Sequence, residues 1–490
     1  MKSLTSQDRK LRKPVKVAQF GEGNFLRAFA DHMIDLAGEA GVFDGGVAII
    51  KPIPFGSLEK FEAADGLYTV ILRGQEGGEK IMHHRIVQSI SKLIDPFTDY
   101  DSFIELAKSE ELRFVISNTT EAGIVFDPRD EFEKRPANSF PGKLVQLLYA
   151  RYESFGGDNS RGLIILPVEL IENNGKTLRE CVQKLIELWE LPQKFWTWVE
   201  SCCIFCNCLV DRIVSGYPAA EADEICEKLL GYKDELLVVG EPFGFWAIES
   251  EQFEVVQKEF PLDKAGLPVV FTDNLRPYRE RKVRILNGGH TASVLAAYLA
   301  GLDTVGNAVE DPIARKLIEN TIYNEIAPTV NLPKAEVRAF ADSVIERFEN
   351  PFIRHELLSI SLNSVSKWKT RVLPSLKDSF AKTGKLPNCL TFSLAALATF
   401  YRSDQRGEDC LIGRRGAEEY PIFDDSHVLD FFAKNSSKNN EDFANILLGN
   451  IVFWGEDLSK VPGMNKKLIG YLDSIERIGM RNALKLVLEA

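Results

Sequence analysis

Hydrophobic positions in the first half of the chain follow two alternating patterns. Short apolar runs of strand length are separated by longer segments in which apolar residues recur at helical spacing. The runs lie at residues 15–20, 46–50, 67–72, 114–117, 163–167 and 202–210. This alternation predicts an α/β fold with a mainly parallel, doubly wound sheet.

The second half of the chain has a different pattern. From about residue 311 the apolar spacing is helical, at residues 357–362, 390–401 and 473–488 among others, with few strand-like runs. A chain of 490 residues also exceeds the size at which one hydrophobic core keeps growing. We therefore expect a doubly wound domain at residues 1–276 and a mostly α-helical domain at 277–490.

A glycine turn follows the first predicted strand. Gly21 and Gly23 precede an amphipathic stretch that reaches about residue 41. Glycines at such a junction let the backbone approach a pyrophosphate, and the helix start favours its negative charge. The third glycine of the usual dinucleotide motif is missing, so an ordinary tight turn is the alternative. The loop at residues 118–123 follows another strand and is a second candidate cofactor contact.

Three polar residues share one segment after the predicted boundary. On an α-helix at about 100° per residue, His290 lies about 80° and Asn287 about 140° around the axis from Lys282. All three can then surround one small ligand. Gly288 and Gly289 each cost roughly 1 kcal/mol in a helix, which predicts that something approaches the backbone closely. The alternative is a surface lysine, a capping asparagine and a core histidine.

Charge and hydropathy exclude several classes of partner. The net charge of −12 argues against a general basic surface for nucleic acid, so an anionic ligand needs a local positive pocket. No apolar run approaches the roughly 20 residues that span a bilayer. The amino terminus lacks the apolar core of a secretory signal. We expect a cytoplasmic protein that binds neither nucleic acid nor membrane.

Metal ligands are sparse in the sequence. The cluster Cys202, Cys203, Cys206 and Cys208 contains a Cys-x-x-Cys spacing, which is found in zinc and redox sites. No second paired cluster follows, and the apolar setting favours a buried strand with reduced thiols as small hydrophobes. The six histidines include no His-x-x-x-His pair. We therefore expect chemistry without a metal.

Several motifs together resemble the mannitol dehydrogenase family, the polyol-specific long-chain dehydrogenases. They are Gln19-Phe-Gly-Glu-Gly-Asn-Phe-Leu-Arg-Ala28, Asp65-Gly-Leu-Tyr-Thr69, Ser117-Asn-Thr-Thr-Glu-Ala-Gly123, Leu209-Val-Asp-Arg-Ile213, Pro277-Tyr-Arg-Glu-Arg-Lys282 and the Lys-x-x-x-x-Asn-x-x-His that begins at Lys282. The resemblance covers nearly the whole chain. The segment Asn24-Phe-Leu-Arg-Ala-Phe29 is similar to the branch of the family that acts on tagaturonate.

The resemblance implies an NAD-binding Rossmann-type domain at 1–276 and a helical substrate and catalytic domain at 277–490. The implied reaction, part of hexuronate catabolism, is reversible reduction of tagaturonate to altronate with hydride from NADH. Lys282 exchanges the proton, Asn287 donates a hydrogen bond to the oxyanion, and His290 binds substrate or orients the lysine. The implied cofactor contacts are Gln19, Phe20, Gly21, Glu22, Gly23, Asn24, Phe25, Leu26, Arg27, Asn118, Thr119, Thr120 and Glu121.

A sugar-acid substrate requires a carboxylate clamp. Lys367 or Arg371 is the candidate, with a solvated basic helix face as the alternative. His355 belongs either to the core or to the site, and Asp211 of the fourth motif is a candidate substrate contact. We expect a monomer or small homo-oligomer. Alternative functions are a mannonate (fructuronate) or polyol dehydrogenase, or a redox-sensing dinucleotide-binding protein.

Two positions depart from the family pattern. Leu170 stands where related enzymes carry a second oxyanion asparagine, so that role is vacant or has moved to Asn173 or Asn207. Lys51 follows the second strand, where an acidic residue usually holds the adenosine ribose. The resemblance implies NAD, although a lysine there could accept the 2′-phosphate of NADP.

Overall fold

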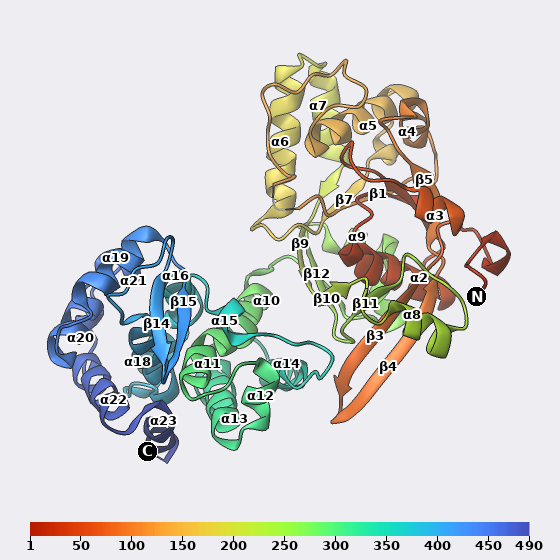
Figure 1. Cartoon of the computed structure of the whole chain (residues 1–490). Helices are drawn as coiled ribbons and strands as arrows, with labels where there is room; N and C mark the ends of the chain where they lie inside the picture. The colour runs from red at the N-terminus through yellow and green to blue at the C-terminus, as the bar shows by residue number, and fades with distance from the viewer. Residues whose placement is uncertain (121, 490) are drawn as a thin grey trace. The chain divides into compact units, whose positions relative to one another are not determined.

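The chain forms two compact units in the computed structural model, which describes residues 1–120 and 122–489 (Figure 1). Unit 1 contains Met1–Gly74 and Lys80–Leu275. Unit 2 contains Gln75–Glu79 and Arg276–Ala490. The first is α/β and the second is rich in helices, which confirms the fold class predicted from the sequence.

A six-stranded parallel sheet forms the centre of unit 1, with the strand order β5-β2-β1-β6-β7-β8. Its strands are β1 (Val15–Phe20), β2 (Gly46–Ile50), β5 (Ile90–Ile94), β6 (Phe114–Ser117), β7 (Ile164–Pro167) and β8 (Ile204–Phe205). The strand order reverses between β1 and β6. Ligands of doubly wound sheets bind at the carboxyl ends of the strands at such a reversal.

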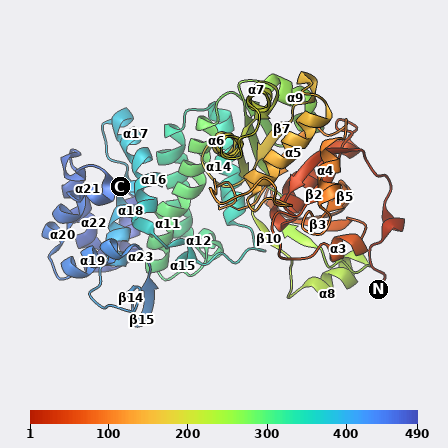
Figure 2. The same cartoon turned by 90° about the horizontal axis from the view of Figure 1, so that it is seen from above.

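Alternate residues of the strands face two separate apolar cores. Val17 of β1 packs into one core, whereas its neighbours Ala18 and Phe20 pack into the other. One face is covered by α4 (Tyr100–Ala107), α5 (Phe140–Ser154), α6 (Asn174–Leu188) and α7 (Gln193–Cys202) (Figure 2). The other face is covered by α2 (His32–Glu39) and α9 (Phe253–Glu259). Burial on both faces explains why these strands are almost wholly apolar.

Two smaller sheets complete unit 1. One has the order β10-β11-β3-β4 and the other β13-β12-β9. Their strands are β3 (Tyr68–Glu76), β4 (Glu79–Val87), β9 (Asn207–Asp211), β10 (Val214–Gly216), β11 (Val238–Gly240), β12 (Phe245–Glu249) and β13 (Val269–Thr272). The short helices α3 (Glu59–Ala63) and α8 (Ala222–Ile225) also belong to unit 1.

Residues 202–210 were predicted to be one strand, and this prediction was wrong. Cys202 ends α7, and the following residues divide between β8 and β9, which belong to different sheets. The backbone of Cys208 bonds instead to the side chain of Asn174, which breaks the pairing with the main sheet. The cysteines are free thiols, and Cys203 and Cys206 are buried as predicted. Burial raises the pKa of both thiols to about 12.

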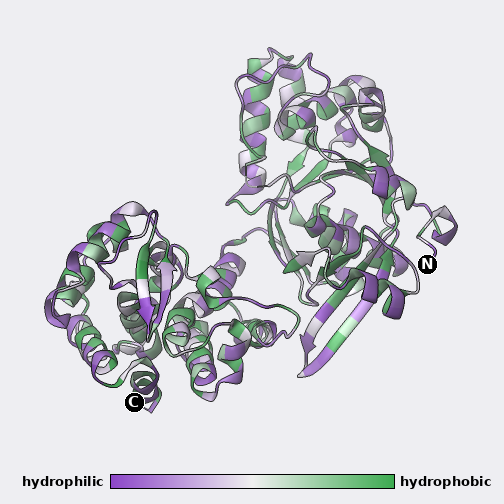
Figure 3. Cartoon of the chain, viewed as in Figure 1, coloured by the Kyte–Doolittle hydropathy of each residue, from purple (hydrophilic) through white to green (hydrophobic). Residues whose placement is uncertain are grey.

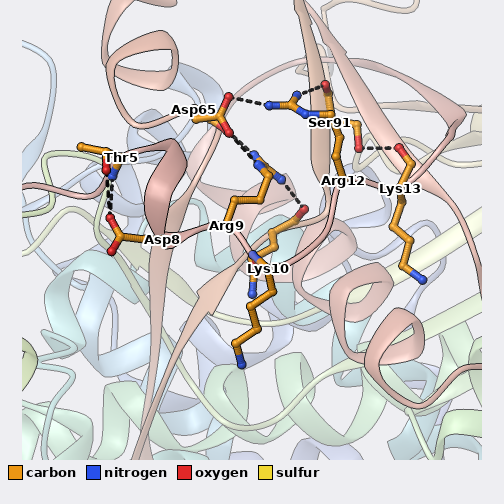
Figure 4. A network of polar contacts seen from close by, with 9 residues as sticks. Thr5, Asp8, Arg9, Lys10, Arg12, Lys13, Asp65 and Ser91 are labelled. Atoms are coloured by element: carbon orange, nitrogen blue, oxygen red, sulfur yellow. Dashed lines mark hydrogen bonds and ion pairs between the residues drawn. The ribbon is translucent and has the colours of Figure 1, made fainter.

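The amino-terminal segment is tied to unit 1 through Asp65 of the Asp-Gly-Leu-Tyr-Thr motif (Figure 4). Arg9 Nε donates to Asp65 Oδ2 at 2.7 Å, and Arg12 Nη2 donates to Asp65 Oδ1 at 2.5 Å. Ser91 Oγ donates to the carbonyl oxygen of Lys13 at 2.8 Å. Because both carboxylate oxygens of Asp65 bind arginines, this motif residue supports the fold.

Two apolar helices that pack against each other form the centre of unit 2. They are α11 (Gly288–Leu299) and α18 (Asn388–Tyr401), which are buried along most of their length. The surrounding helices show alternating polar and apolar surfaces (Figure 3). They are α10 (Arg276–Arg281), α12 (Val305–Glu310), α13 (Pro312–Glu319), α14 (Lys334–Phe348), α15 (Leu357–Ile360), α16 (Ser364–Arg371), α17 (Leu373–Thr383), α19 (Ser426–Asn435), α20 (Asn440–Leu448), α21 (Ile451–Trp454), α22 (Met464–Ile478) and α23 (Met480–Glu489).

Two features of unit 2 differ from the sequence prediction. The predicted helix at residues 473–488 is divided between α22 and α23 at Gly479, whose φ of 78° ends the first helix. The hairpin of β14 (Leu411–Arg415) and β15 (Glu418–Ile422) was not predicted. Across the part of the chain that the structure describes, every helix is too short or too polar to cross a bilayer.

Candidate active site

The glycine turn after β1 has the geometry of a backbone cradle. Gly21 has φ of +124°, and a Cβ atom there would lie 3.1 Å from the carbonyl oxygen of Asn118, so a larger residue is strained. A Cβ atom on Gly23 would meet nothing within 4 Å. Gly23 is therefore not required by packing within the chain. Its backbone opens onto free space at the start of a helix, a position that favours negative charge in proteins.

A network of buried polar side chains forms hydrogen bonds with the backbone of this turn. Gln19 Nε2 donates to the Gly21 carbonyl oxygen at 3.1 Å and to Asp31 Oδ2 at 3.2 Å. Tyr68 of the Asp-Gly-Leu-Tyr-Thr motif donates to the same Asp31 oxygen at 3.2 Å. Burial raises the pKa of Asp31 to about 7, and these two hydrogen bonds oppose the shift. The network connects β1, the first helix and β3.

The predicted cofactor contacts divide into buried and exposed residues. Gln19, Phe20, Gly21, Leu26 and Arg27 are buried within unit 1, so their side chains shape the turn. The guanidinium of Arg27 donates to the Leu236 carbonyl oxygen and to Asn24 Oδ1.

Nearer the surface, Glu22 and Phe25 are half-buried, and Gly23 and Asn24 are exposed. The first helix begins with α1 (Asn24–Leu26) and continues through a π-helical segment, Arg27–Asp31, into α2.

The loop after β6 is held by Glu169, a residue that the sequence reasoning did not assign. Its Oε1 accepts hydrogen bonds from the Thr119 amide at 2.9 Å and from Thr119 Oγ1 at 3.0 Å. Ser117 Oγ donates to Oε2 at 3.1 Å. Burial raises the pKa of this carboxyl, and its hydrogen bonds oppose the shift. An acidic residue two positions after the apolar strand at 164–167 was the available sequence signal.

Other predicted residues of this loop keep distinct positions. Asn118 Nδ2 donates to the Val168 carbonyl oxygen at 3.2 Å. Thr120 is exposed and has φ of +71°, which is uncommon outside glycine. Glu121 lies outside the described residues.

The second oxyanion amide has two candidates with different surroundings. Leu170, at the position where related enzymes carry the amide, is exposed. Asn207 is engaged in the fold, since its Oδ1 accepts from the Lys176 amide and its Nδ2 donates to Glu249. Asn173 precedes α6 in a left-handed conformation, with φ of 54°. Both polar atoms of the Asn207 side chain are thus used in hydrogen bonds that hold the fold.

In unit 2, one continuous helix carries Lys282, Asn287 and His290. It contains α10, the π-helical segment Lys282–Asn287 and α11. The three side chains are partly exposed, whereas the intervening Ile285 and Leu286 are buried. The sequence prediction used α-helical angles, but the π-helical segment changes the phase between Lys282 and Asn287. Such segments are frequent at functional sites.

The glycine pair in this helix is explained by packing between helices. A Cβ atom on Gly288 would lie 2.9 Å from the Arg371 carbonyl oxygen on α16. One on Gly289 would lie 3.0 Å from a terminal methyl group of Ile322. The close approach predicted from the sequence is therefore confirmed, and the groups that approach the glycines belong to neighbouring chain segments.

His290 lies in an aromatic and cationic environment. Its ring centroid is 4.1 Å from that of Phe348 and 5.4 Å from that of His355. Burial lowers the pKa of His290 well below its ordinary value, and the charges of His355, Arg347 and Arg371 add to the shift. Among the described residues, none forms a hydrogen bond with its buried Nδ1. The neutral ring thus retains a polar atom for another group.

The basic residues of α16 belong to the same electrostatic environment. Lys367 Nζ donates to the Ile360 carbonyl oxygen at 3.0 Å. Burial lowers the pKa of Lys367, with a further contribution from Arg371, and burial also lowers the pKa of Arg371. Both side chains are half-buried, which differs from a fully solvated basic face. Together with His290 and His355 they form a cluster that we name the basic cluster.

The start of α16 is fixed by a buried hydrogen-bond chain. Tyr401 Oη donates to Asp424 Oδ2 at 2.6 Å and accepts from the Ser364 amide at 3.0 Å. Asp424 also opposes the lowering of the Lys367 pKa. These hydrogen bonds anchor the start of the helix that carries Lys367 and Arg371.

Asp211, the remaining predicted substrate contact, ends β9 in unit 1. It is buried and lies opposite Phe245 in the register of β9 and β12. Among the described residues, no three histidine, cysteine, aspartate or glutamate side chains lie close enough together to hold a metal ion.

Comparison with known proteins identifies both halves of the chain. Residues 15–264 match the mannitol dehydrogenase Rossmann domain, and residues 274–476 match the mannitol dehydrogenase C-terminal domain. Altronate oxidoreductase of Bacillus subtilis (strain 168) is 44% identical over 475 residues, which covers 96% of this chain and 95% of the relative. Altronate oxidoreductase of Cronobacter sakazakii (strain ATCC BAA-894) is 42% identical, with 96% of each chain covered.

Solved structures share the fold. A D-sorbitol dehydrogenase in substrate-free form has a TM-score of 0.77 at 21% identity, covering 96% of this chain and 95% of that one. A Pseudomonas fluorescens mannitol 2-dehydrogenase in a ternary complex with NAD and D-mannitol has a TM-score of 0.64 at 20% identity, covering 97% and 95%. With the two domain matches and the relatives above 40% identity, the chain belongs to the mannitol dehydrogenase family of oxidoreductases.

Proposed function

We propose that this protein reduces the ketone of D-tagaturonate to D-altronate with NADH, reversibly and without a metal ion. The name of the relatives, altronate oxidoreductase, supports the substrate, because their similarity extends over 96% of the chain. Fold alone does not choose between substrates.

The glycine turn fits a dinucleotide. Gly23 opens onto free space at a helix start, and Gly21 allows the chain to pass close to Asn118. Free backbone amides at such a position bind a pyrophosphate. Bound NADH supplies the hydride. The residues proposed to hold it are the exposed and half-buried members of the turn together with Asn118 and Thr119.

Three side chains of unit 2 are proposed to act on the reacting oxygen. In reduction, the protonated Nζ of Lys282 holds the proton that this oxygen receives, and Asn287 Nδ2 donates a hydrogen bond to it. In oxidation, neutral Lys282 accepts the proton. The lowered pKa keeps His290 neutral, so its ring offers one donor and one acceptor to a substrate hydroxyl.

The basic cluster is the observation that carries the sugar-acid assignment. In a chain of net charge −12, Arg371 lies close enough to both Lys367 and His290 to lower the pKa of each, and the ring of His355 packs edge-on against that of His290. A substrate carboxylate would offset this local repulsion, and an arginine can bind it through two parallel hydrogen bonds. A neutral sugar would supply no such charge.

The direct test compares three substrates with the purified protein. Oxidation of NADH is followed by absorbance with tagaturonate, fructuronate and fructose, and Lys282→Ala provides the background rate. The proposal expects the highest kcat/KM with tagaturonate. Preference for fructuronate would instead identify a mannonate dehydrogenase, and preference for fructose a polyol dehydrogenase without a functional carboxylate clamp.

A further inference from the structure

A buried ion pair lies at the carboxyl ends of β2 and β5. Lys51 directly follows β2 and Asp95 directly follows β5. Lys51 Nζ donates to Asp95 Oδ2 at 2.8 Å, and its side chain is 5% exposed, whereas that of Asp95 is 22% exposed. The ammonium is thus covered, and part of the carboxylate remains accessible.

Backbone hydrogen bonds connect this pair to the glycine turn. The Gly21 amide donates to the Ile50 carbonyl oxygen at 3.1 Å, and the Lys51 amide donates to the Ile94 carbonyl oxygen at 3.0 Å. Burial raises the pKa of Glu22 in the turn, and both charges of the pair also act on this carboxyl: Lys51 opposes the shift, whereas Asp95 adds to it. The ion pair therefore lies beside the turn proposed to hold the pyrophosphate.

The pair occupies the usual position of ribose recognition. In Rossmann folds an acidic residue after the second strand accepts a hydrogen bond from the ribose 2′-hydroxyl, and a cation there accommodates a 2′-phosphate. This chain has a lysine at that position, which by itself suggests NADP. In the structure, however, the lysine side chain is buried and its positive charge is paired with the Asp95 carboxylate.

We propose that Asp95, held in place by Lys51, is the acceptor for the ribose 2′-hydroxyl and that the ion pair selects NADH over NADPH. This inference rests on the proposed function, because it requires a dinucleotide at the turn. A 2′-phosphate would face the Asp95 carboxylate and find the Lys51 ammonium already paired. The residue that selects the cofactor thus follows β5, whereas in the usual Rossmann pattern it follows β2.

Binding measurements with two variants test the proposal without catalysis. Dissociation constants of NADH and NADPH are measured by fluorescence titration of the full-length protein. Asp95→Asn removes the repulsion and releases Lys51, so the ratio of the NADPH to the NADH constant should fall roughly 10- to 100-fold. Lys51→Met should not improve NADPH binding, because the carboxylate remains.

A second lysine–aspartate pair provides the matched control. Lys13 Nζ donates to Asp44 Oδ1 at 2.6 Å, and these residues precede β1 and β2, at the amino ends of the strands. Asp44→Asn should leave the cofactor ratio unchanged. Thermal unfolding of each variant shows whether it is folded.

Each outcome decides between the possibilities. An unchanged ratio in folded Asp95→Asn, with NADH still bound by the wild-type protein, overturns the inference and leaves the proposed function standing. Tighter binding of NADPH than NADH by the wild-type protein, lost in Lys51→Met, would show that Lys51 binds the phosphate. If neither dinucleotide binds, the proposed function fails together with the inference.

Discussion

Gly288 on α11 lies directly against the backbone of Arg371 on α16, since a Cβ atom on the glycine would come within 2.9 Å of the arginine carbonyl oxygen. The first helix continues from the segment that carries Lys282, and the second carries the basic cluster residues Lys367 and Arg371. This contact therefore fixes the separation between the proposed acid/base helix and the proposed carboxylate clamp.

Replacing Gly288 by alanine should force these helices apart. Gly288→Ala is expected to lower the free energy of unfolding by about 1–3 kcal/mol, because a backbone oxygen cannot rotate out of the way. Urea unfolding measures the change. Gly470→Ala on α22, where a Cβ atom would meet nothing within 4 Å, is the control and should be neutral or stabilising by up to roughly 1 kcal/mol. Equal effects of the two substitutions would contradict the packing explanation.

Removing the cations of α16 should affect charged substrates selectively. Lys367→Met and Arg371→Met are each expected to raise KM for tagaturonate by roughly tenfold or more, because each removes a charge-assisted hydrogen bond to the carboxylate. Activity with neutral fructose should change little. Lys369→Met on the same helix is the control, since that side chain lies near Gly455. An equal loss of activity with tagaturonate and with fructose would indicate that these residues have a structural role.

The acid/base assignment predicts a loss of turnover in a folded protein. Lys282→Ala should reduce kcat by about 10²- to 10⁴-fold, because no other group is proposed to exchange the proton. Steady-state kinetics and thermal unfolding are measured together. Lys316→Ala, at an exposed position on α13, should retain wild-type activity. Full activity of Lys282→Ala would falsify the mechanism.

The buried carboxylate of Glu169 should determine the order of the loop after β6. Glu169→Gln keeps the size of the side chain but loses acceptor capacity for Ser117 and Thr119. We expect NADH binding to weaken by roughly tenfold, because the predicted contacts Asn118 and Thr119 lose their support. Fluorescence titration measures it, and Glu180→Gln on exposed α6 surface is the control. Unchanged affinity would mean that the loop does not contact the cofactor.

Asp31 should make stability depend on pH in the acidic range. Its pKa is about 7 in the folded protein and 3.8 in the unfolded chain, so the folded state binds more protons between these values. Stability is therefore expected to fall as pH rises from about 4 to about 7, by at most ~4 kcal/mol, and to level off above.

The matching variant is Asp31→Asn, which cannot ionise. Chemical unfolding at several pH values should show its advantage over the wild-type protein growing as pH rises toward 7. Asp101→Asn, at an exposed position on α4, should keep the wild-type profile. An advantage that is the same at every pH would show that Asp31 is already ionised or already neutral throughout.

Much of unit 1 could be predicted from local patterns. Apolar runs such as residues 114–117 are short and buried on both faces, so their length and composition identify them without a partner. Strand β4 was missed because it is only partly buried: most of its side chains are exposed or half-buried, so no apolar run marks it. Where the chain switches between sheets, the Cys208 backbone forms hydrogen bonds with the side chain of Asn174, more than thirty positions away in the sequence.

The sequence by itself determined the order of α/β and helical halves, the glycine turn, the family and the polar triad of Lys282, Asn287 and His290, because these depend on residue type and spacing. Only the tertiary structure decided what surrounds them. It showed that Gly288 serves helix packing, that Asp95 neutralises Lys51, and that Glu169 holds the loop at Thr119. Those relationships join residues distant in sequence, and burial and charge pairing there depend on the folded backbone.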